Sequence, residues 1–150
     1  MDNVQILYNV FDDLVEVTDD GGGPEDCWLQ IKNQEGGSGT DPVVYGNTFT
    51  DYNCAIHLYD GGNTDYAVSV KNNIFDTPKS GGYHINVESF SGNGDNVFVD
   101  YNVYYPDTSG SDNVWTWDGT NCTDYDDWKT DSGQDGNSPA DVADPLLQAD

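Results

Sequence analysis

Four segments of the chain share an asparagine that is followed two residues later by an aromatic side chain: VQILYNVF, PVVYGNTF, VSVKNNIF and VFVDYNVY. The shared asparagines are Asn9, Asn47, Asn73 and Asn102, at intervals of 38, 26 and 29 residues. Aliphatic residues recur at alternate positions before each asparagine, which is the period of strands that bury one face. The repeat therefore predicts a stack of short, equivalent strands.

A repeat of 26 to 29 residues, with no helix-period stretch between the strands, favours a parallel β-solenoid of about four coils. Equivalent side chains would form ladders about 4.8 Å apart. A buried asparagine at a tight bend would satisfy backbone groups that the regular ladder cannot reach. The longer first interval fits if it contains an ordinary strand, CWLQIKN, and a long loop. A β-sandwich is the alternative, but it does not explain why the asparagine returns at the same strand end.

The chain of 150 residues is expected to form one all-β domain, with coils over about 1–118 and an irregular segment over 119–150. It opens inside the first asparagine segment, and the end of such a stack leaves backbone N–H and C=O groups unpaired. We therefore expect end-to-end stacking, as a homo-oligomer or as part of a longer solenoid.

The charge balance excludes two classes of partner. The chain has 28 acidic and 4 basic residues, for a net charge of −24. Nothing in it could neutralise the phosphates of a nucleic acid, and an anionic membrane would repel it. It also lacks an apolar run long enough for membrane insertion. Two explanations of the acidity remain open: solvation in high salt, as in halophilic proteins, or loops that bind Ca²⁺.

The three cysteines, Cys27, Cys54 and Cys122, include no CxxC pair. Three buried free thiols are the simpler interpretation, and one disulfide with one free thiol is the alternative. The acidic stretch Asp131–Gly136 does not fit an EF-hand, because its third position is Gly133 and its twelfth is Val142.

The C-terminal part follows a Trp-x4-Gly-x-Asp-x-x-Ser pattern and then an Asp-Pro-hydrophobic ending. Its residues are Trp128, Gly133, Asp135, Ser138, Asp144 and Pro145. Together with the four asparagine segments, it resembles the right-handed parallel β-helix proteins of the pectate-lyase-like superfamily. The resemblance covers nearly the whole chain and implies that fold. It implies no single activity, because the superfamily includes lyases, hydrolases, epimerases, phage tailspikes and adhesins.

A second strand follows each asparagine segment: LVEVTDD, AIHLYDG, GYHINVE and VWTWDGT. Aligning these strands puts Glu16, His57, His84 and Thr116 in one outward column, with Tyr59 and Asn86 in the next. We therefore expect the two histidines to be exposed neighbours. The predicted ligand-binding residues are Glu16, His57, Tyr59, His84 and Asn86. If a metal binds, its predicted ligands are Glu16, His57 and His84.

The function favoured by these features is a carbohydrate-associated, non-catalytic module of a secreted or surface protein, with a polysaccharide or cell-surface glycan as its partner. Lyase or hydrolase chemistry of the pectate-lyase-like kind is one alternative. The absence of arginine counts against a lyase, because such enzymes generally use Arg or Lys at the uronate. A structural or adhesive fibre or a viral appendage segment is the other alternative. Calcium is the only cofactor that the sequence suggests.

Overall fold

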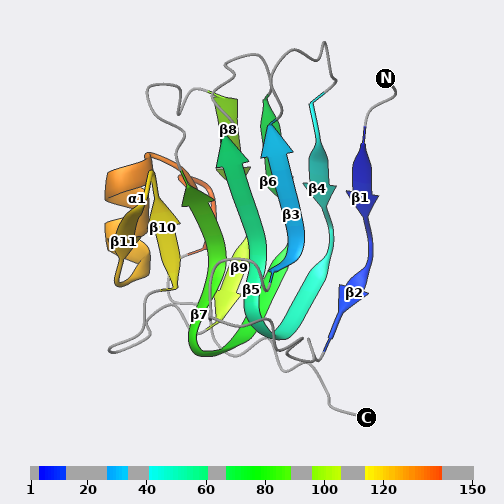
Figure 1. The fold of residues 1–150 in the computed structure, drawn as a ribbon, viewed down its shortest axis with the longest axis horizontal. Coiled ribbons are helices and arrows are strands. Elements are labelled where there is room, and N and C mark those ends of the chain that lie inside the picture. The colour runs from blue at the N-terminus through cyan, green and yellow to red at the C-terminus, as the bar shows by residue number, and fades with distance from the viewer. Residues whose placement is uncertain are drawn as a thin grey trace.

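In the computed structural model, the described residues are 4–12, 27–33, 41–60, 67–88, 96–105 and 114–139. They form two sheets, with one helix at one end of the stack of strands (Figure 1). The smaller sheet has the order β1 (Gln5–Leu7), β4 (Val43–Tyr45), β6 (Val68–Lys71) and β8 (Val97–Asp100). The larger sheet contains β2 (Val10–Phe11), β3 (Cys27–Asn33), β5 (Thr48–Asp60), β7 (Ile74–Glu88), β9 (Val103–Tyr105), β10 (Trp115–Trp117) and β11 (Thr120–Cys122). The helix is α1 (Tyr125–Ser132).

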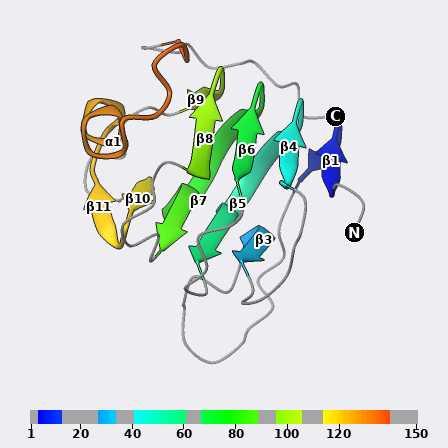
Figure 2. The same cartoon turned by 90° about the horizontal axis from the view of Figure 1, so that it is seen from above.

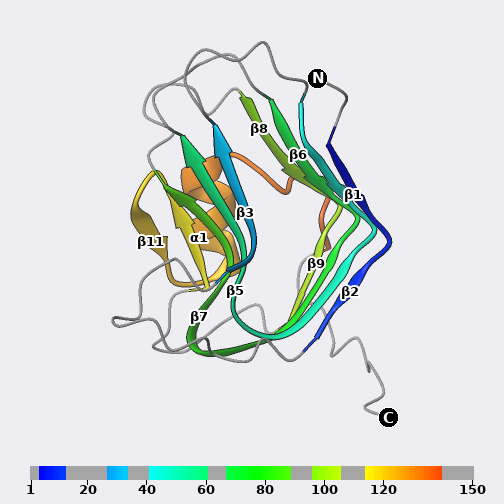
Figure 3. The same cartoon turned by 45° about the vertical axis from the view of Figure 1, so that its right-hand side comes forward.

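The expected right-handed parallel β-helix of about four regular coils is wrong. The larger sheet is mixed, because β10 and β11 pair antiparallel. The strands differ greatly in length, and the long β5 and β7 bend so that the two sheets curl into a half-barrel (Figure 3). Asp118 and Gly119 both have positive φ, as a two-residue hairpin turn requires, and this turn reverses the chain after β10. A Cys27–Asn33 strand was predicted from CWLQIKN and is confirmed.

A sharp bend precedes each of the four asparagines. The residues immediately before them adopt left-handed backbone conformations: Tyr8 (φ 56°), Gly46 (φ 68°), Asn72 (φ 55°) and Tyr101 (φ 59°). Glycine and asparagine adopt this conformation readily, whereas tyrosine does so at a cost. The bends turn the chain from β1, β4, β6 and β8, which lie side by side in Figure 2, into the strands of the larger sheet. The two sheets therefore meet along the row of asparagines.

The asparagine side chains form a continuous hydrogen-bonded ladder. The amide oxygen of Asn73 accepts from the backbone N of Asn47 at 2.9 Å and from its Nδ2 at 3.1 Å. Asn73 in turn donates from its backbone N and Nδ2 to the amide oxygen of Asn102, at 3.0 and 3.1 Å. Asn47, Asn73 and Asn102 are at most 1% exposed. The expectation that Asn47 and Asn73 are buried and bonded to backbone at a bend is confirmed.

An aromatic stack runs parallel to this ladder. The rings of Phe11 and Phe49 lie 4.9 Å apart, those of Phe49 and Phe75 lie 5.1 Å apart, and Phe75 and Tyr104 follow at 5.1 Å. In all three pairs the ring planes are nearly parallel, with interplanar angles of 5°, 8° and 12°. Aliphatic side chains from both sheets complete the core, with Ile56, Leu58, Ile85, Val44, Val70 and Val99 among its members.

The segment after β10 covers one end of the ladder and of the stack. The sequence predicts an irregular segment over 119–150, whereas its described part contains β11 and α1. Asp124 caps the start of the helix by accepting from Asp127 N, and Gly133 ends it in the left-handed conformation. Trp128 of the helix stacks on Trp115 of β10 at 6.5 Å. The helix therefore belongs to the core rather than to a loose tail. Among the described residues, no helix has both the length and the apolarity needed to cross a membrane.

Candidate functional site on the larger sheet

A row of polar side chains crosses four strands on the face of the larger sheet that lies opposite the core. Backbone pairing puts Gln30 opposite His57, His57 opposite Asn86, and Asn86 opposite Thr116. Along each strand these residues alternate with core side chains such as Ile56 and Leu58. They therefore point away from the core, because successive side chains of a strand face opposite sides.

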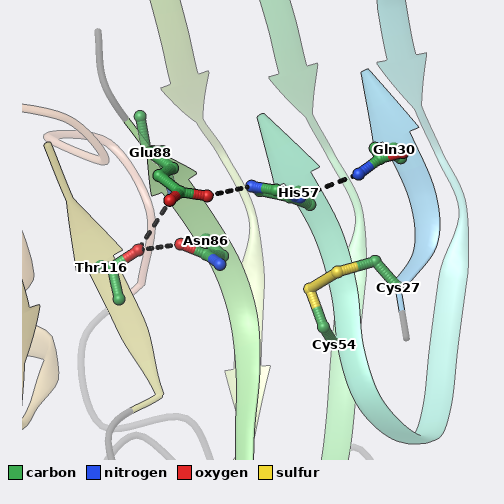
Figure 4. The surroundings of a disulfide bond; sticks show 8 residues. Cys27, Gln30, Cys54, His57, Asn86, Glu88 and Thr116 are labelled. Atoms are coloured by element: carbon green, nitrogen blue, oxygen red, sulfur yellow. Dashed lines mark hydrogen bonds and ion pairs between the residues drawn. A yellow bond between two sulfur atoms is a disulfide. The ribbon is translucent and has the colours of Figure 1, made fainter. Parts of the chain in front are cut away.

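His57 is the centre of this row (Figure 4). Its Nδ1 lies 3.3 Å from Nε2 of Gln30, and its Nε2 lies 3.0 Å from Oε2 of Glu88. An amide nitrogen can only donate, so the contact with Gln30 assigns the acceptor role to Nδ1. The proton of the neutral imidazole is then on Nε2 and is donated to the Glu88 carboxylate. His57 thus links an amide from β3 to a carboxylate from β7.

The groups that solvent can reach surround His57, which is itself only 3% exposed. Gln30 is exposed, and Tyr59 is partly exposed. The Glu88 side chain is 42% exposed. The rings of His57 and Tyr59 lie 6.1 Å apart. The accessible part of the site is therefore an amide, a phenol ring and a carboxylate, and the imidazole behind them fixes two of the three.

A disulfide fixes the register of the first two strands of this row. Cys27 and Cys54 lie opposite each other on β3 and β5 and are joined by a disulfide. Each cysteine stands three residues before its member of the polar row, Gln30 or His57. The bond therefore holds Gln30 opposite His57 (Figure 4). Cys122 is free and buried, so one bridge with one free thiol is correct and three free thiols is wrong.

The alignment that placed His84 beside His57 is wrong. His84 is fully buried, and its ring lies 4.8 Å from that of Trp115 and 5.4 Å from that of Tyr104. Its Nδ1 makes a short hydrogen bond with the hydroxyl of Tyr52. Burial, and the nearby carboxylate of Asp76, raise the pKa of Tyr52, so the phenol keeps its proton and can donate it to His84. His84 is a core residue whose polarity Tyr52 satisfies.

The error comes from an irregularity in β7. Tyr52 pairs with Pro78, but Cys54 pairs with Tyr83, so β7 contains additional residues at this point. The register beyond it is shifted, and Asn86 rather than His84 lies opposite His57. Gly82 is required in the irregular stretch, since a Cβ there would lie 2.7 Å from the carbonyl oxygen of Lys79 on the same strand and 2.8 Å from that of Asn53 on β5. A side chain at this position would force the two strands apart.

The other predicted site residues have different outcomes. Asn86 and Tyr59 both lie at the polar row, although Asn86 is 7% exposed and accepts from the hydroxyl of Thr116. Glu16 lies outside the described residues. The proposed metal set of Glu16, His57 and His84 loses His84 to the core. In the part of the chain that the structure describes, no group of three or more side chains could hold a metal ion.

Gln30 is the residue of the polar row that the strand alignment did not predict. The signal was present: CWLQ and CAIH both place a polar residue three positions after a cysteine, inside an alternating strand. Aligning these two segments would have put Gln30 opposite His57. Glu88 follows Asn86 by two residues on β7, so its contact with His57 runs diagonally between the strands. The sequence could indicate only that Glu88 lies near a histidine.

Comparison with known proteins adds no relative, since no family model, curated protein or solved structure matches this chain.

Proposed function

We propose that the chain is a non-catalytic, carbohydrate-associated module and that it binds a neutral glycan at the exposed groups around His57. The observation that carries this proposal is the arrangement of Gln30, Tyr59 and Glu88 around one buried imidazole. A carboxylate accepts hydrogen bonds from sugar hydroxyls, an amide both donates and accepts, and a phenol ring packs against the apolar face of a sugar.

A neutral glycan fits the electrostatics better than an acidic one. The net charge of −24 would repel uronates and sulfated sugars, and the Glu88 carboxylate adds negative charge at the site itself. Of the basic side chains, Lys71 lies over the ring of Phe98 and Lys129 pairs with Asp126. Neither of these two lysines lies in the polar row, but Lys32 lies next to it, since its backbone pairs with that of Tyr59.

Two further observations support this function. The Cys27–Cys54 disulfide supports a secreted or surface location, because such bonds persist in oxidising compartments. The sequence resemblance to pectate-lyase-like proteins points to the same class of ligand, and it stays a prediction. A lyase or hydrolase stays the alternative, and His57 with its Glu88 partner would be its candidate base.

A glycan screen with and without Ca²⁺ tests the proposal. Wild-type protein should bind one or more neutral oligosaccharides, and binding should not require Ca²⁺. Glu88→Gln keeps the shape of the side chain but removes its charge, so it should weaken binding by about tenfold, the loss of one charge-assisted hydrogen bond. Asp126→Asn, an equivalent change at an exposed position on α1, should have no effect. Failure of wild-type protein to bind any neutral glycan would contradict the proposal.

A further inference from the structure

The strands β1 and β2 form an edge that is open in the described part of the chain. β1 is the outermost strand of the smaller sheet, and β2 is outermost beside β5 in the larger one. Val4, Tyr8 and Val10 are 57%, 74% and 73% exposed. Residues 4–11 carry no charged side chain, in a protein with 28 acidic residues. An uncharged open edge is a template for pairing with another strand.

The asparagine ladder specifies what such a strand must contain, because each of its junctions follows the same rule. The backbone N and Nδ2 of one asparagine donate to the amide oxygen of the next, as Asn73 donates to Asn102 at 3.0 and 3.1 Å. The asparagine that accepts these bonds donates back from its own Nδ2. Its acceptor is the backbone carbonyl three residues before the donating asparagine: Asn102 donates to Val70 O at 3.0 Å, and Asn47 donates to Ile6 O at 2.9 Å.

Asn9 is the last asparagine of the ladder on the β1 side, and it lacks the bonds that a preceding asparagine segment would make with it. No donor from the described residues reaches its Oδ1. Its Nδ2 bonds to Leu7 O and to Asn47 Oδ1, both at 3.1 Å. Nδ2 of Asn73 makes the equivalent two bonds, to Lys71 O and Asn102 Oδ1, and also donates to Val44 O. By the same geometry, Nδ2 of Asn9 can donate to one more backbone carbonyl. Phe11 likewise ends the series of parallel rings on this side, with the ring of Trp28 tilted beside it at 5.7 Å.

We infer that the β1–β2 edge binds, in trans, an extended segment of a different polypeptide. The segment runs parallel to β1 and carries the pattern apolar-x-x-Asn-x-aromatic. Its asparagine donates to Oδ1 of Asn9, its carbonyl three residues earlier accepts from Nδ2 of Asn9, and its aromatic ring continues the stack on Phe11. Its paired part has no net negative charge, because the rest of the protein surface would repel an acidic strand.

A second copy of the chain fits this edge less well. Two copies would each bring a net charge of −24. The opposite end, which would have to supply a parallel strand, is already occupied, since Gln134 and Asp135 bond to the backbone of Val99. Antiparallel pairing of two β1 strands would leave Asn9 and Phe11 unmatched, because the chain bends at Tyr8.

A peptide with the sequence AVSVKNNIFDT, residues 67–77 of this chain, is a suitable probe. Inside the protein this segment already makes the required contacts to Asn102, and its Lys and Asp balance in charge. The measurement is the fluorescence anisotropy of the labelled, end-capped peptide titrated with the full chain. We expect saturable binding, weakened at least about tenfold when the peptide asparagine that corresponds to Asn73 is replaced by leucine.

Two variants of the chain locate the binding. Val10→Asp places a charge on the exposed edge and should also weaken binding at least about tenfold, whereas Phe98→Asp, the same change at an exposed position on β8, should not. Equal binding by both peptides, or by the Val10→Asp chain, would overturn the inference, as would no binding by wild-type protein. Light scattering tests whether a second copy of the chain occupies the edge instead. If the chain self-associates, Val10→Asp abolishes the self-association and no peptide binds, the edge belongs to a second copy. This test is independent of the glycan site.

Discussion

Asn102 donates from Nδ2 to Oδ1 of Asp135 at 3.4 Å, so the asparagine ladder ends on a buried carboxylate. The other oxygen of Asp135 accepts from Nε1 of Trp128 at 2.7 Å and from the hydroxyl of Tyr104 at 2.8 Å. Ser138 donates to Asp135 and accepts from the backbone N of Asn102 at 2.8 Å. One carboxylate therefore ties the ladder and the aromatic stack to the end of α1.

Replacing Asp135 by asparagine should destabilise the protein. In either orientation the amide nitrogen would face an N–H donor, the indole of Trp128 or Nδ2 of Asn102. Neither can become an acceptor, and an unpaired buried polar group costs about 1–3 kcal/mol. Urea unfolding followed by tryptophan fluorescence measures the change in the free energy of unfolding. Asp126→Asn, at an exposed carboxylate, should leave it unchanged.

The same variant should alter the pH dependence of stability. Burial raises the pKa of Asp135 above its ordinary value of 3.8. The folded state therefore holds this proton more tightly than the unfolded chain does, and this group's contribution to stability falls as pH rises from about 3.8 through the raised pKa. Asp135→Asn lacks that slope, so its deficit relative to wild type should be larger at pH 4 than at pH 7. A deficit that grows with pH would contradict the assignment.

Phe75 lies in the middle of the aromatic stack, between Phe49 and Tyr104, and is fully buried. Phe75→Ala should lower the free energy of unfolding by about 3–5 kcal/mol, through lost burial and the cavity left behind. Phe98→Ala is the matched control, because Phe98 is 46% exposed and should cost well under about 1 kcal/mol. Similar losses in the two variants, measured by thermal or urea unfolding, would show that the stack is not part of the core.

Reducing the Cys27–Cys54 disulfide should also destabilise the protein. The bond closes a loop with a sequence separation of 27, for which the loss of chain entropy in the unfolded state predicts about 3–4 kcal/mol. Unfolding with and without a phosphine reductant measures the effect.

Burial raises the pKa of the Cys122 thiol to about 11, so alkylation of the folded, unreduced protein at pH 8 should be very slow. Rapid alkylation of the folded protein, or equal stability with and without reductant, would count against this disulfide state.

Salt should stabilise the protein. With a net charge of −24, carboxylates repel one another in dilute buffer, and ions screen that repulsion. We expect molar NaCl to raise the melting temperature. A comparison with CaCl2 at equal ionic strength separates the two explanations of the acidity. Stabilisation by millimolar Ca²⁺ alone would favour bound calcium, and equal stability in water, NaCl and CaCl2 would contradict both.

The sequence predicted the features that repeat. Asn47 and Asn73 and their aromatic partners recur with a fixed local spacing, so their ladder and stack follow from alignment alone. The position of His84 could not be found in this way, because the irregularity between Pro78 and Tyr83 changes the register without any break in the alternating pattern. The role of Gln30 depended on which strand lies beside β5, a non-local pairing that local periodicity does not encode.

The segment from Trp128 to Ser138 was likewise predictable only in part. The spacing of Trp128, Gly133, Asp135 and Ser138 was recognised as a pattern. Its physical purpose, to satisfy the ends of the ladder and of the aromatic stack, is visible only when the chain folds back on Asn102. The regular solenoid expected from the repeat failed because that expectation ignored the hairpin at Asp118 and the helix that follows it.

The proposed binding of a neutral glycan at the groups around His57 is tested most directly by one calorimetric comparison. A neutral oligosaccharide is titrated into wild-type protein, Tyr59→Ala and Tyr101→Ala; Tyr101 is a 51% exposed tyrosine at a bend between β8 and β9. Removing the Tyr59 ring should weaken binding about tenfold, as for a ring contact worth roughly 1.4 kcal/mol, whereas Tyr101→Ala should bind as wild type does. Equal affinity in wild type and Tyr59→Ala would contradict the proposal.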